Sequence, residues 1–272
     1  MIKLGIAFVV AGIFGSGSEF FVRSYLNNVG DLDVVGLYNA GFMMTMTYAG
    51  MIFSAMETDY FPRLSGISEL GSSFNLTVNN QMEVSLLLIS PLLVLFMFSL
   101  PMLLPLLLSK AFLPITDMMR YAILAMYLRA LNLPMEYIAL ARGDSRSFLL
   151  VEAVDDLLFV AAVIVGYHWD GVTGTGVGLL VSGSLTFLFV WAYTHWKYGF
   201  SLSGGLLFFM LLQFPLGVAA CYFTGALTGT AYWLVGLSLV LLAAGASYRA
   251  LRAQDALREY VLRRLRSRFH KN

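Results

Sequence analysis

The sequence predicts an all-α membrane protein, a bundle of about eight transmembrane helices. Hydrophobic residues make up 59% of the 272-residue chain and charged residues only 12%, and the mean hydropathy is +0.77, well outside the composition of a soluble domain. The apolar runs have about the 20 residues that a helix needs to cross roughly 30 Å of hydrocarbon. They are nearly continuous rather than alternating in polarity, which argues against a transmembrane β-barrel.

Eight apolar runs follow one another along the chain, separated by polar or glycine- and proline-containing links. We predict helices over residues 4–27, 34–61, 84–108, 114–140, 147–168, 173–196, 204–226 and 229–248. Pro62 and Arg63 mark the predicted end of the second helix at a membrane surface. Residues 65–83 form the longest polar link. Prolines in the third and fourth runs predict bent or broken helices, which are common in transporters.

The basic residues predict how the chain is oriented in the membrane. If the N-terminus is cytoplasmic, most of the 17 lysines and arginines fall in inner loops and in the C-terminal tail, as the positive-inside rule requires. We therefore expect an even number of spans and both termini in the cytoplasm. In residues 249–272 arginines alternate with apolar residues at roughly helical spacing, which predicts a basic amphipathic helix on the anionic inner leaflet.

Charged residues inside the predicted spans are the candidate functional residues, because an ionisable group is costly in hydrocarbon unless it is paired or faces water. The predicted spans hold Glu19 and Arg23 in the first helix, Asp117, Arg120, Arg129 and Glu136 in the fourth, and Glu152, Asp155 and Asp156 in the fifth. From their depths we predict two clusters: Glu19, Arg23, Asp117 and Arg120 toward the outside, and Arg129, Asp155 and Asp156 nearer the midplane.

These charges have two interpretations. One is a water-filled translocation path, in which arginines attract an anionic diphosphate and carboxylates take up H⁺ or Na⁺. The path would comprise the arginines Arg23, Arg120 and Arg129 and the carboxylates Glu19, Asp117, Glu136, Asp155 and Asp156. The other interpretation is a set of internal ion pairs that hold neighbouring helices in register. The number of charges in so apolar a chain favours the translocation path.

Other chemistry has little support in the sequence. Cys221 is the only cysteine, which excludes a disulfide framework or a cysteine zinc site. The three histidines lack metal-ligand spacing. The glycine-rich stretch 171–178 lacks the Lys-Ser/Thr of a phosphate loop and is typical of close helix packing. We expect no catalytic residue, no metal, no cofactor and no nucleic-acid partner. A membrane-embedded glycan polymerase or ligase is an alternative, although the predicted outer loops are short.

Several short motifs resemble those of a transporter family. They are RSYL at 23–26 and GDLDVVGLYNAG at 30–41, FPRLS at 61–65, GTGVGLLVSG at 174–183 and KYGF at 197–200. Their order is similar to that in the polysaccharide flippases of the multidrug/oligosaccharidyl-lipid/polysaccharide exporter superfamily. The resemblance implies a transporter, not an enzyme, that flips an undecaprenyl-diphosphate-linked oligosaccharide across the bacterial inner membrane for polysaccharide, O-antigen or lipopolysaccharide biosynthesis. The multidrug branch, which exports organic cations, is the alternative.

The resemblance also implies an arrangement of domains and a partner. Family members have two six-helix lobes, and the motif at 30–41 lies near the start of the second lobe. We therefore expect a six-helix lobe over residues 1–200, two additional helices over 201–248 and a cytoplasmic tail over 249–272. A missing N-terminal lobe or a second copy would be the partner, together with membrane lipids. In the family, basic residues in a cavity between lobes contact the lipid diphosphate, a role for Arg23, Arg120 or Arg129.

Overall fold

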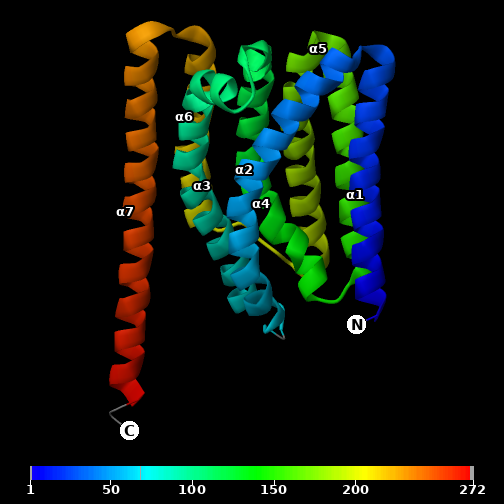
Figure 1. The fold of residues 1–272 in the computed structure, drawn as a ribbon. Helices are drawn as coiled ribbons and strands as arrows, with labels where there is room; N and C mark the ends of the chain where they lie inside the picture. The colour runs from blue at the N-terminus through cyan, green and yellow to red at the C-terminus, as the bar shows by residue number, and fades with distance from the viewer. Residues whose placement is uncertain (1, 68, 270–272) are drawn as a thin grey trace.

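The computed structural model describes residues 2–67 and 69–269 and shows a bundle of helices that run up and down one long axis (Figure 1). In chain order the elements are α1 (Ile2–Val29), α2 (Leu32–Ser65), α3 (Ser72–Leu107), the short 3-10 helix η1 (Lys110–Ile115), α4 (Thr116–Ala141), α5 (Ser145–Tyr198), α6 (Gly204–Ala226) and α7 (Gly229–Phe269). The described residues contain no strand, so the predicted all-α class is confirmed. The start of α1 and the end of α7 lie toward the same end of the bundle.

Four helices in the described part of the chain are long and apolar enough to cross a membrane. They cover Gly5–Val29, Ser72–Leu107, Gly204–Ala226 and Gly229–Ala253, and they identify a membrane protein. Large apolar side chains such as Phe20 and Leu211 are more than two-thirds exposed on the outer faces, as expected where lipid replaces water. Four is fewer than the eight predicted spans. Polar and charged residues lower the hydropathy of α2 and α4, and two predicted spans belong to the single element α5.

The element α5 reverses direction sharply near its middle. The backbone leaves helical geometry at Asp170 (φ −149°) and Gly171 (φ 53°, ψ −137°), and the positive φ of Gly171 favours glycine. The two arms of α5 then pack very closely: a Cβ added to Gly174 would lie 1.9 Å from the carbonyl oxygen of Gly166. The glycine-rich stretch therefore serves close helix packing, as predicted, because only residues without a side chain let the backbones approach this far.

A polar cluster joins the two arms of α5 at their other end. Asp144, the N-cap of α5, accepts a hydrogen bond from the backbone N–H of Ser147 at 3.2 Å and pairs with Lys197 Nζ at 2.6 Å. The Tyr198 hydroxyl donates to the same carboxylate at 3.1 Å. Burial alone raises the pKa of Asp144, but hydrogen bonds from Lys197, Ser147 and Tyr198 outweigh it and hold the pKa well below the ordinary 3.8. The ionised carboxylate therefore stabilises this end of the hairpin.

The polar stretch 65–83 is mostly helical, contrary to the predicted link. The helix α3 begins at Ser72, and its Asn79 and Glu83 are buried. Asn79 Nδ2 donates to the Ser201 carbonyl at 2.8 Å, and Asn79 Oδ1 accepts from the backbone N–H of Ser203 at 2.7 Å. Glu83 accepts from the Ser203 hydroxyl at 3.0 Å. These polar side chains anchor the α5–α6 connection, so the helix extends through them.

Prolines occur within the helices, some in the interior and some in the last turn. The predicted stop at Pro62 is wrong, because α2 continues to Ser65. Further prolines lie within α3 (Pro91, Pro101, Pro105), α4 (Pro134) and α6 (Pro215). A proline removes one intrahelical hydrogen bond and bends the helix. At Pro134 the Tyr60 hydroxyl of α2 donates to the proline carbonyl at 2.8 Å, which joins α2 to α4.

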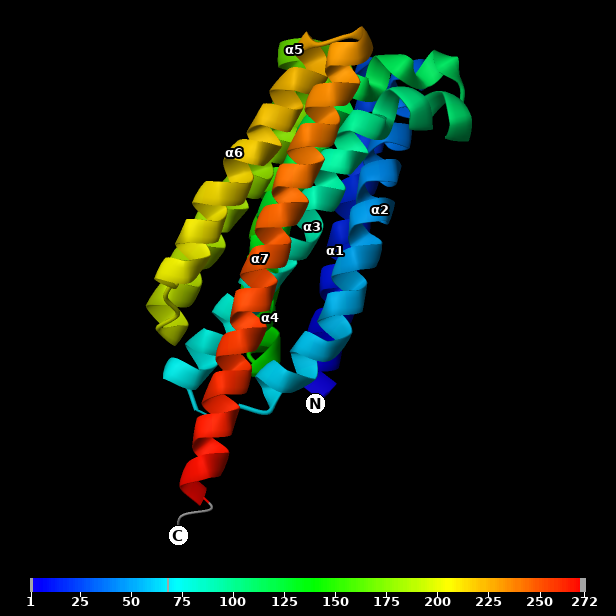
Figure 2. The same ribbon diagram turned by 90° about the vertical axis from the view of Figure 1, so that its left-hand side faces the viewer.

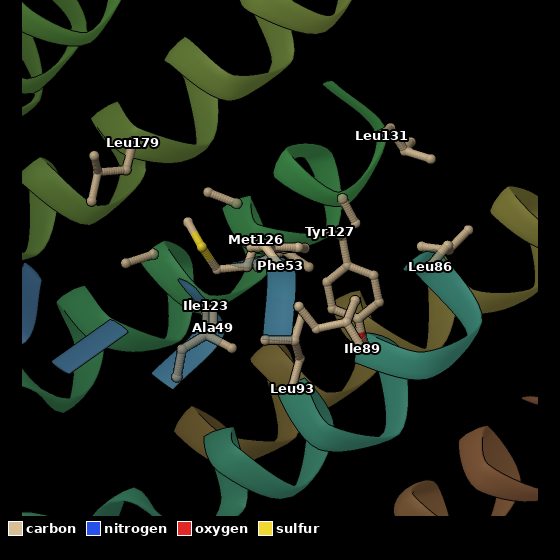
Figure 3. Packing of buried hydrophobic residues seen from close by; sticks show 14 of the residues in the cluster. Ala49, Phe53, Leu86, Ile89, Leu93, Ile123, Met126, Tyr127, Leu131 and Leu179 are labelled. Atoms are coloured by element: carbon tan, nitrogen blue, oxygen red, sulfur yellow. The ribbon is translucent and has the colours of Figure 1, made fainter. Parts of the chain in front are cut away.

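The helix α4 is the centre of the bundle and contacts α2, α3, α5 and α6. Figure 3 shows the buried side chains where α2, α3 and α4 meet: Ala49, Phe53, Leu86, Ile89, Leu93, Ile123, Met126 and Tyr127. Tyr127 is fully buried and donates its hydroxyl to the Ser90 carbonyl at 3.2 Å. Lipid is as apolar as this core, so close packing and hydrogen bonds rather than the hydrophobic effect hold these helices together.

The two C-terminal helices pack along α3. The Tyr232 hydroxyl of α7 donates to the Phe98 carbonyl at 2.9 Å, and a Cβ added to Gly236 would lie 2.5 Å from the Phe98 ring. Residues 249–269 of the predicted tail continue α7 without a break, and Figure 2 shows this part projecting beyond the other helices along its own axis. Residues 270–272 of that prediction lie outside the described residues.

Replacing Gly174 by alanine should destabilise the hairpin of α5. The new Cβ would overlap the Gly166 carbonyl, and overpacking of this kind costs about 1–3 kcal/mol, so the melting temperature in detergent should fall clearly. Gly36→Ala in α2 is the matched control, since no atom lies within 4 Å of the added Cβ, and it should be neutral or slightly stabilising. Equal melting shifts for the two variants would contradict the packing.

Replacing Asp144 by asparagine should lower the melting temperature at neutral pH and make it less dependent on pH in the acid range. A carboxyl whose pKa is depressed by folding stabilises the folded state above its ordinary pKa of 3.8, and this stabilisation is lost as the pH falls below that value. Melting curves of both proteins from pH 6 to pH 3 test this. A wild-type melting temperature that falls no more steeply with acid than that of Asp144→Asn would show that the Asp144 carboxylate contributes nothing to stability.

Candidate functional site

A polar cavity of about 220 Å³ lies among α1, α2, α4 and α5. Its charged and polar lining comprises Glu19 from α1, Arg129 and Asn132 from α4, and Asp155, Asp156 and Ser182 from α5. Apolar side chains, including Phe42, Met46, Phe159 and Leu179, complete the walls. The charged residues all lie well inside their helices rather than at the helix ends, and in a membrane protein an ionisable group in such a position is a functional candidate.

Arg129 connects α4 to α5 across this cavity. Its Nη1 atom lies 3.2 Å from Glu136 Oε2 and 3.7 Å from Asp155 Oδ2. Arg129 and Glu136 are two helical turns apart, which places them on one face of α4. The other oxygen of Asp155 accepts a hydrogen bond from the Thr186 hydroxyl at 2.6 Å, so Asp155 is held between α4 and the second arm of α5. The arginine side chain is still 39% exposed, which leaves it accessible from the cavity.

Asp156 faces the opposite wall of the cavity, formed by α1. Its Oδ1 lies 3.9 Å from the Cβ position of Gly15, and Glu19 of the same helix lines the cavity together with Asp156. Glu19 in turn is paired with Arg23 Nη2 at 2.8 Å. Asp156 Oδ2 is buried without a hydrogen-bond partner among the described residues. A proton, a cation or a ligand hydroxyl would satisfy this oxygen.

The structure rearranges the two predicted clusters. Arg129, Asp155 and Asp156 lie together, as the sequence predicted, and Glu19 lies with them rather than in a separate outer cluster. Arg23 does not line the cavity but orients Glu19. Arg120 pairs with Asp117 at 3.4 Å and lies against α6. The predicted outer cluster is therefore divided: Glu19 lies beside Arg129, whereas Arg120 lies on the other side of α4. Arg120 and Arg129 face opposite ways because they are nine residues apart in one helix.

An apolar crevice of about 570 Å³ adjoins the cavity between α1 and α5. Its walls include Ile13, Phe14, Phe21, Leu157 and Val160, and it shares Asp156 with the cavity. Four of these side chains, Ile13, Phe14, Phe21 and Leu157, are more than half exposed, so the crevice opens toward the surrounding lipid. A polar compartment and an apolar compartment thus meet at one carboxylate.

Sequence reasoning missed three polar residues around the cavity: Asn132, Ser182 and Thr186. Asn132 Nδ2 donates to the Gly183 carbonyl at 3.2 Å, whereas its Oδ1 is buried without a partner among the described residues. Asn132 lies one turn after Arg129 and close to Pro134, a signal that could have identified it. Ser182 and Thr186 carry no such signal, because small hydroxyl residues are common in membrane helices.

The lining of the cavity is more acidic than basic, with three carboxylates and one arginine. Such a lining can take up a proton or a monovalent cation, accept hydrogen bonds from hydroxyl groups and bind an anionic group at one point, Arg129. No group of three or more His, Cys, Asp or Glu residues with metal-site geometry occurs in the described ranges.

Compared with protein-family models, curated proteins and solved structures, the chain matches none of them.

Replacing Arg129 by alanine should destabilise the bundle by about 1–3 kcal/mol, less than for a fully buried ion pair because the arginine side chain is 39% exposed. The change removes the positive charge that faces Glu136, whose side chain is only 7% exposed. The double variant Arg129→Met/Glu136→Gln, which removes both charges, should recover most of the loss. Melting temperatures in one detergent measure both effects, with Arg146→Ala, an exposed arginine at the start of α5, as control. If the double variant is no more stable than Arg129→Ala, the pair is not the source of the effect.

Proposed function

We propose that this chain is a membrane transporter that flips an undecaprenyl-diphosphate-linked oligosaccharide across the bacterial inner membrane. The observation that carries the proposal is the junction of two compartments at Asp156: a charged cavity among α1, α2, α4 and α5, and an apolar, lipid-facing crevice between α1 and α5. A ligand that combines a charged head with a long hydrocarbon chain has the polarity of this pair of compartments.

Each part of such a lipid has suitable partners in the site. The guanidinium of Arg129 presents planar donors to diphosphate oxygens. The carboxylates of Glu19, Asp155 and Asp156 can accept hydrogen bonds from sugar hydroxyls. The isoprenoid chain would lie along Phe14 and the other apolar walls of the crevice.

The size of the cavity bears on the transport cycle. Its volume of about 220 Å³ is below the roughly 300–1,000 Å³ of typical ligand pockets, so in this conformation it can hold only the charged part of the lipid. We therefore propose that the helices rock apart to admit the sugars, in an alternating-access cycle. The hairpin of α5, which carries Asp155 and Asp156 on one arm and Thr186 on the other, would move as one unit.

The motifs at 23–41, 61–65, 174–183 and 197–200 support the same proposal through their resemblance to polysaccharide flippases. On the same resemblance, the proposal includes an additional lobe or a second copy of the chain as partner. It also places both termini in the cytoplasm, because of the distribution of arginines and lysines.

A second candidate function is export of organic cations coupled to H⁺ or Na⁺. The excess of carboxylates over arginine in the cavity favours it, because an acidic lining attracts cations. The two functions differ in which residues they need: Arg129 for a diphosphate, and the carboxylates Glu19, Asp155 and Asp156 for a cation.

Ligand binding to the purified protein in neutral-lipid nanodiscs should distinguish the two functions. With a short-chain prenyl-diphosphate-linked sugar as probe, Arg129→Met/Glu136→Gln should weaken affinity about tenfold or more through loss of charge-assisted hydrogen bonds. Arg129→Lys, which keeps the charge but not the planar fork, should give an intermediate loss. The control Arg146→Ala should bind as the wild type does.

Tetraphenylphosphonium serves as the cation probe in the same nanodiscs. Flippase function predicts weak binding of this probe and little effect of Asp155→Asn/Asp156→Asn upon it. Tight tetraphenylphosphonium binding that depends on these two carboxylates, together with diphosphate binding that ignores Arg129, would establish the cation exporter instead.

A further inference from the structure

Arg120 lies in a separate crevice on the side of α4 that faces away from the central cavity. The crevice measures about 420 Å³ and is formed by α4 and α6. Its lining consists of Arg120, Tyr121, Leu124, Val218, Cys221, Tyr222, Gly225 and Ala226. None of these residues lines the central cavity, so the transport site proposed above makes no use of Arg120.

The guanidinium of Arg120 has spare hydrogen-bonding capacity in this crevice. An arginine carries five N–H donors. In the described part of the chain its one polar partner is Asp117, at 3.4 Å from Nη2, and the Asp117 side chain is 54% exposed. The guanidinium also stacks over Tyr121 at 5.2 Å, while Nε is buried without an acceptor. A cation held in place this way, and only weakly neutralised, is suited to an anionic ligand.

Gly225 creates the space that the guanidinium occupies. A Cβ at this position of α6 would lie 1.5 Å from Arg120 Nη1. The absence of a side chain therefore lets the charged end of Arg120 reach across from α4 to the last turn of α6. Any larger residue at 225 would displace it.

The walls and the depth of the crevice indicate a lipid ligand. Val218 and Tyr222 are 53% and 68% exposed on a helix that can cross a membrane, so they face acyl chains. Arg120 lies in the second turn of α4 and Gly225 in the last turn of α6, which places the charge near one end of these helices, where headgroups lie. The N-terminus of α4 and the C-terminus of α6 lie at this end, and their opposite dipole potentials offset each other, so the positive charge of the crevice comes from Arg120 itself.

We propose that the α4–α6 crevice binds the phosphate of a membrane phospholipid. Arg120 donates to the phosphate oxygens, and one acyl chain lies along Val218 and Tyr222. An anionic headgroup such as that of phosphatidylglycerol binds better than a zwitterionic one, because it brings a net negative charge to Arg120, whereas the net charge of a zwitterionic headgroup is zero. This site is independent of the transport function, since it uses neither the central cavity nor the α1–α5 crevice.

Native mass spectrometry of the full chain tests the site directly. The protein is released from nanodiscs that contain equal amounts of phosphatidylglycerol and phosphatidylcholine, and retained lipids are counted. Arg120→Ala should reduce retained phosphatidylglycerol about tenfold, the effect of losing charge-assisted hydrogen bonds. Gly225→Leu should do the same with Arg120 still present, because its side chain fills the crevice. Lys110→Ala, an exposed cation of η1, should leave retention unchanged.

Three results would overturn the proposal. The first is wild-type retention in monodisperse Arg120→Ala protein. The second is an equal loss in Lys110→Ala, which would indicate a non-specific effect of charge. The third is binding of inorganic phosphate to lipid-free protein that is as tight as binding of phosphatidylglycerol, which would indicate a simple anion site. If Gly225→Leu fails to fold, Gly225→Ala replaces it, since even its Cβ displaces Nη1.

Discussion

The pairing of Arg129 with Glu136 and Asp155 is the interaction on which the arrangement of the central helices depends. In hydrocarbon a lone charge is costly, so Arg129 must find carboxylates at its own depth. Glu136 satisfies this along α4 itself, and Asp155 satisfies it across the gap to α5. The second contact fixes the first arm of α5 against α4, and the hydrogen bond from Thr186 to Asp155 fixes the second arm. The position of the cavity follows, because the same arm presents Asp156 to α1.

Backbone proximity is the second requirement of this geometry. Asp155 and Thr186 can meet because the arms of α5 approach closely at Gly166 and Gly174. The Asp144–Lys197 pair holds the same arms together at their other end. The charged residues and the glycines therefore act together: the glycines permit the approach, and the ion pairs and hydrogen bonds select one register of it. Hydrophobicity contributes little to that selection, because an apolar side chain has a similar free energy in contact with lipid and in contact with another helix.

The sequence was informative about helices and charges and less so about their boundaries and partners. Composition predicted the all-α class, and long apolar runs located the helices. The prediction from apolar content missed the helix at residues 72–83. There Asn79 and Glu83 form hydrogen bonds with Ser201 and Ser203, and α3 extends through them. That pairing joins distant parts of the chain and has no local signature. Depth counting grouped Arg129 with Asp155 correctly, but it cannot show which way a side chain points around the helix axis, so it placed Glu19 beside Arg120.

Helical phase explains why α4 serves two kinds of chemistry. Nine residues correspond to two and a half turns, so Arg120 and Arg129 lie on opposite faces of one helix. Arg129 pairs with two carboxylates on the inner side, Glu136 and Asp155, and lines the same cavity as Asp156. Arg120 meets one carboxylate, Asp117, and a wall of α6 in which Gly225 makes room for the guanidinium beside the apolar side chains of Val218 and Tyr222. Two identical side chains on the same helix thus differ in what they can bind: the inner arginine lies in a cavity lined by three carboxylates, whereas the outer one has a single carboxylate partner and borders a crevice whose α6 wall carries exposed apolar side chains.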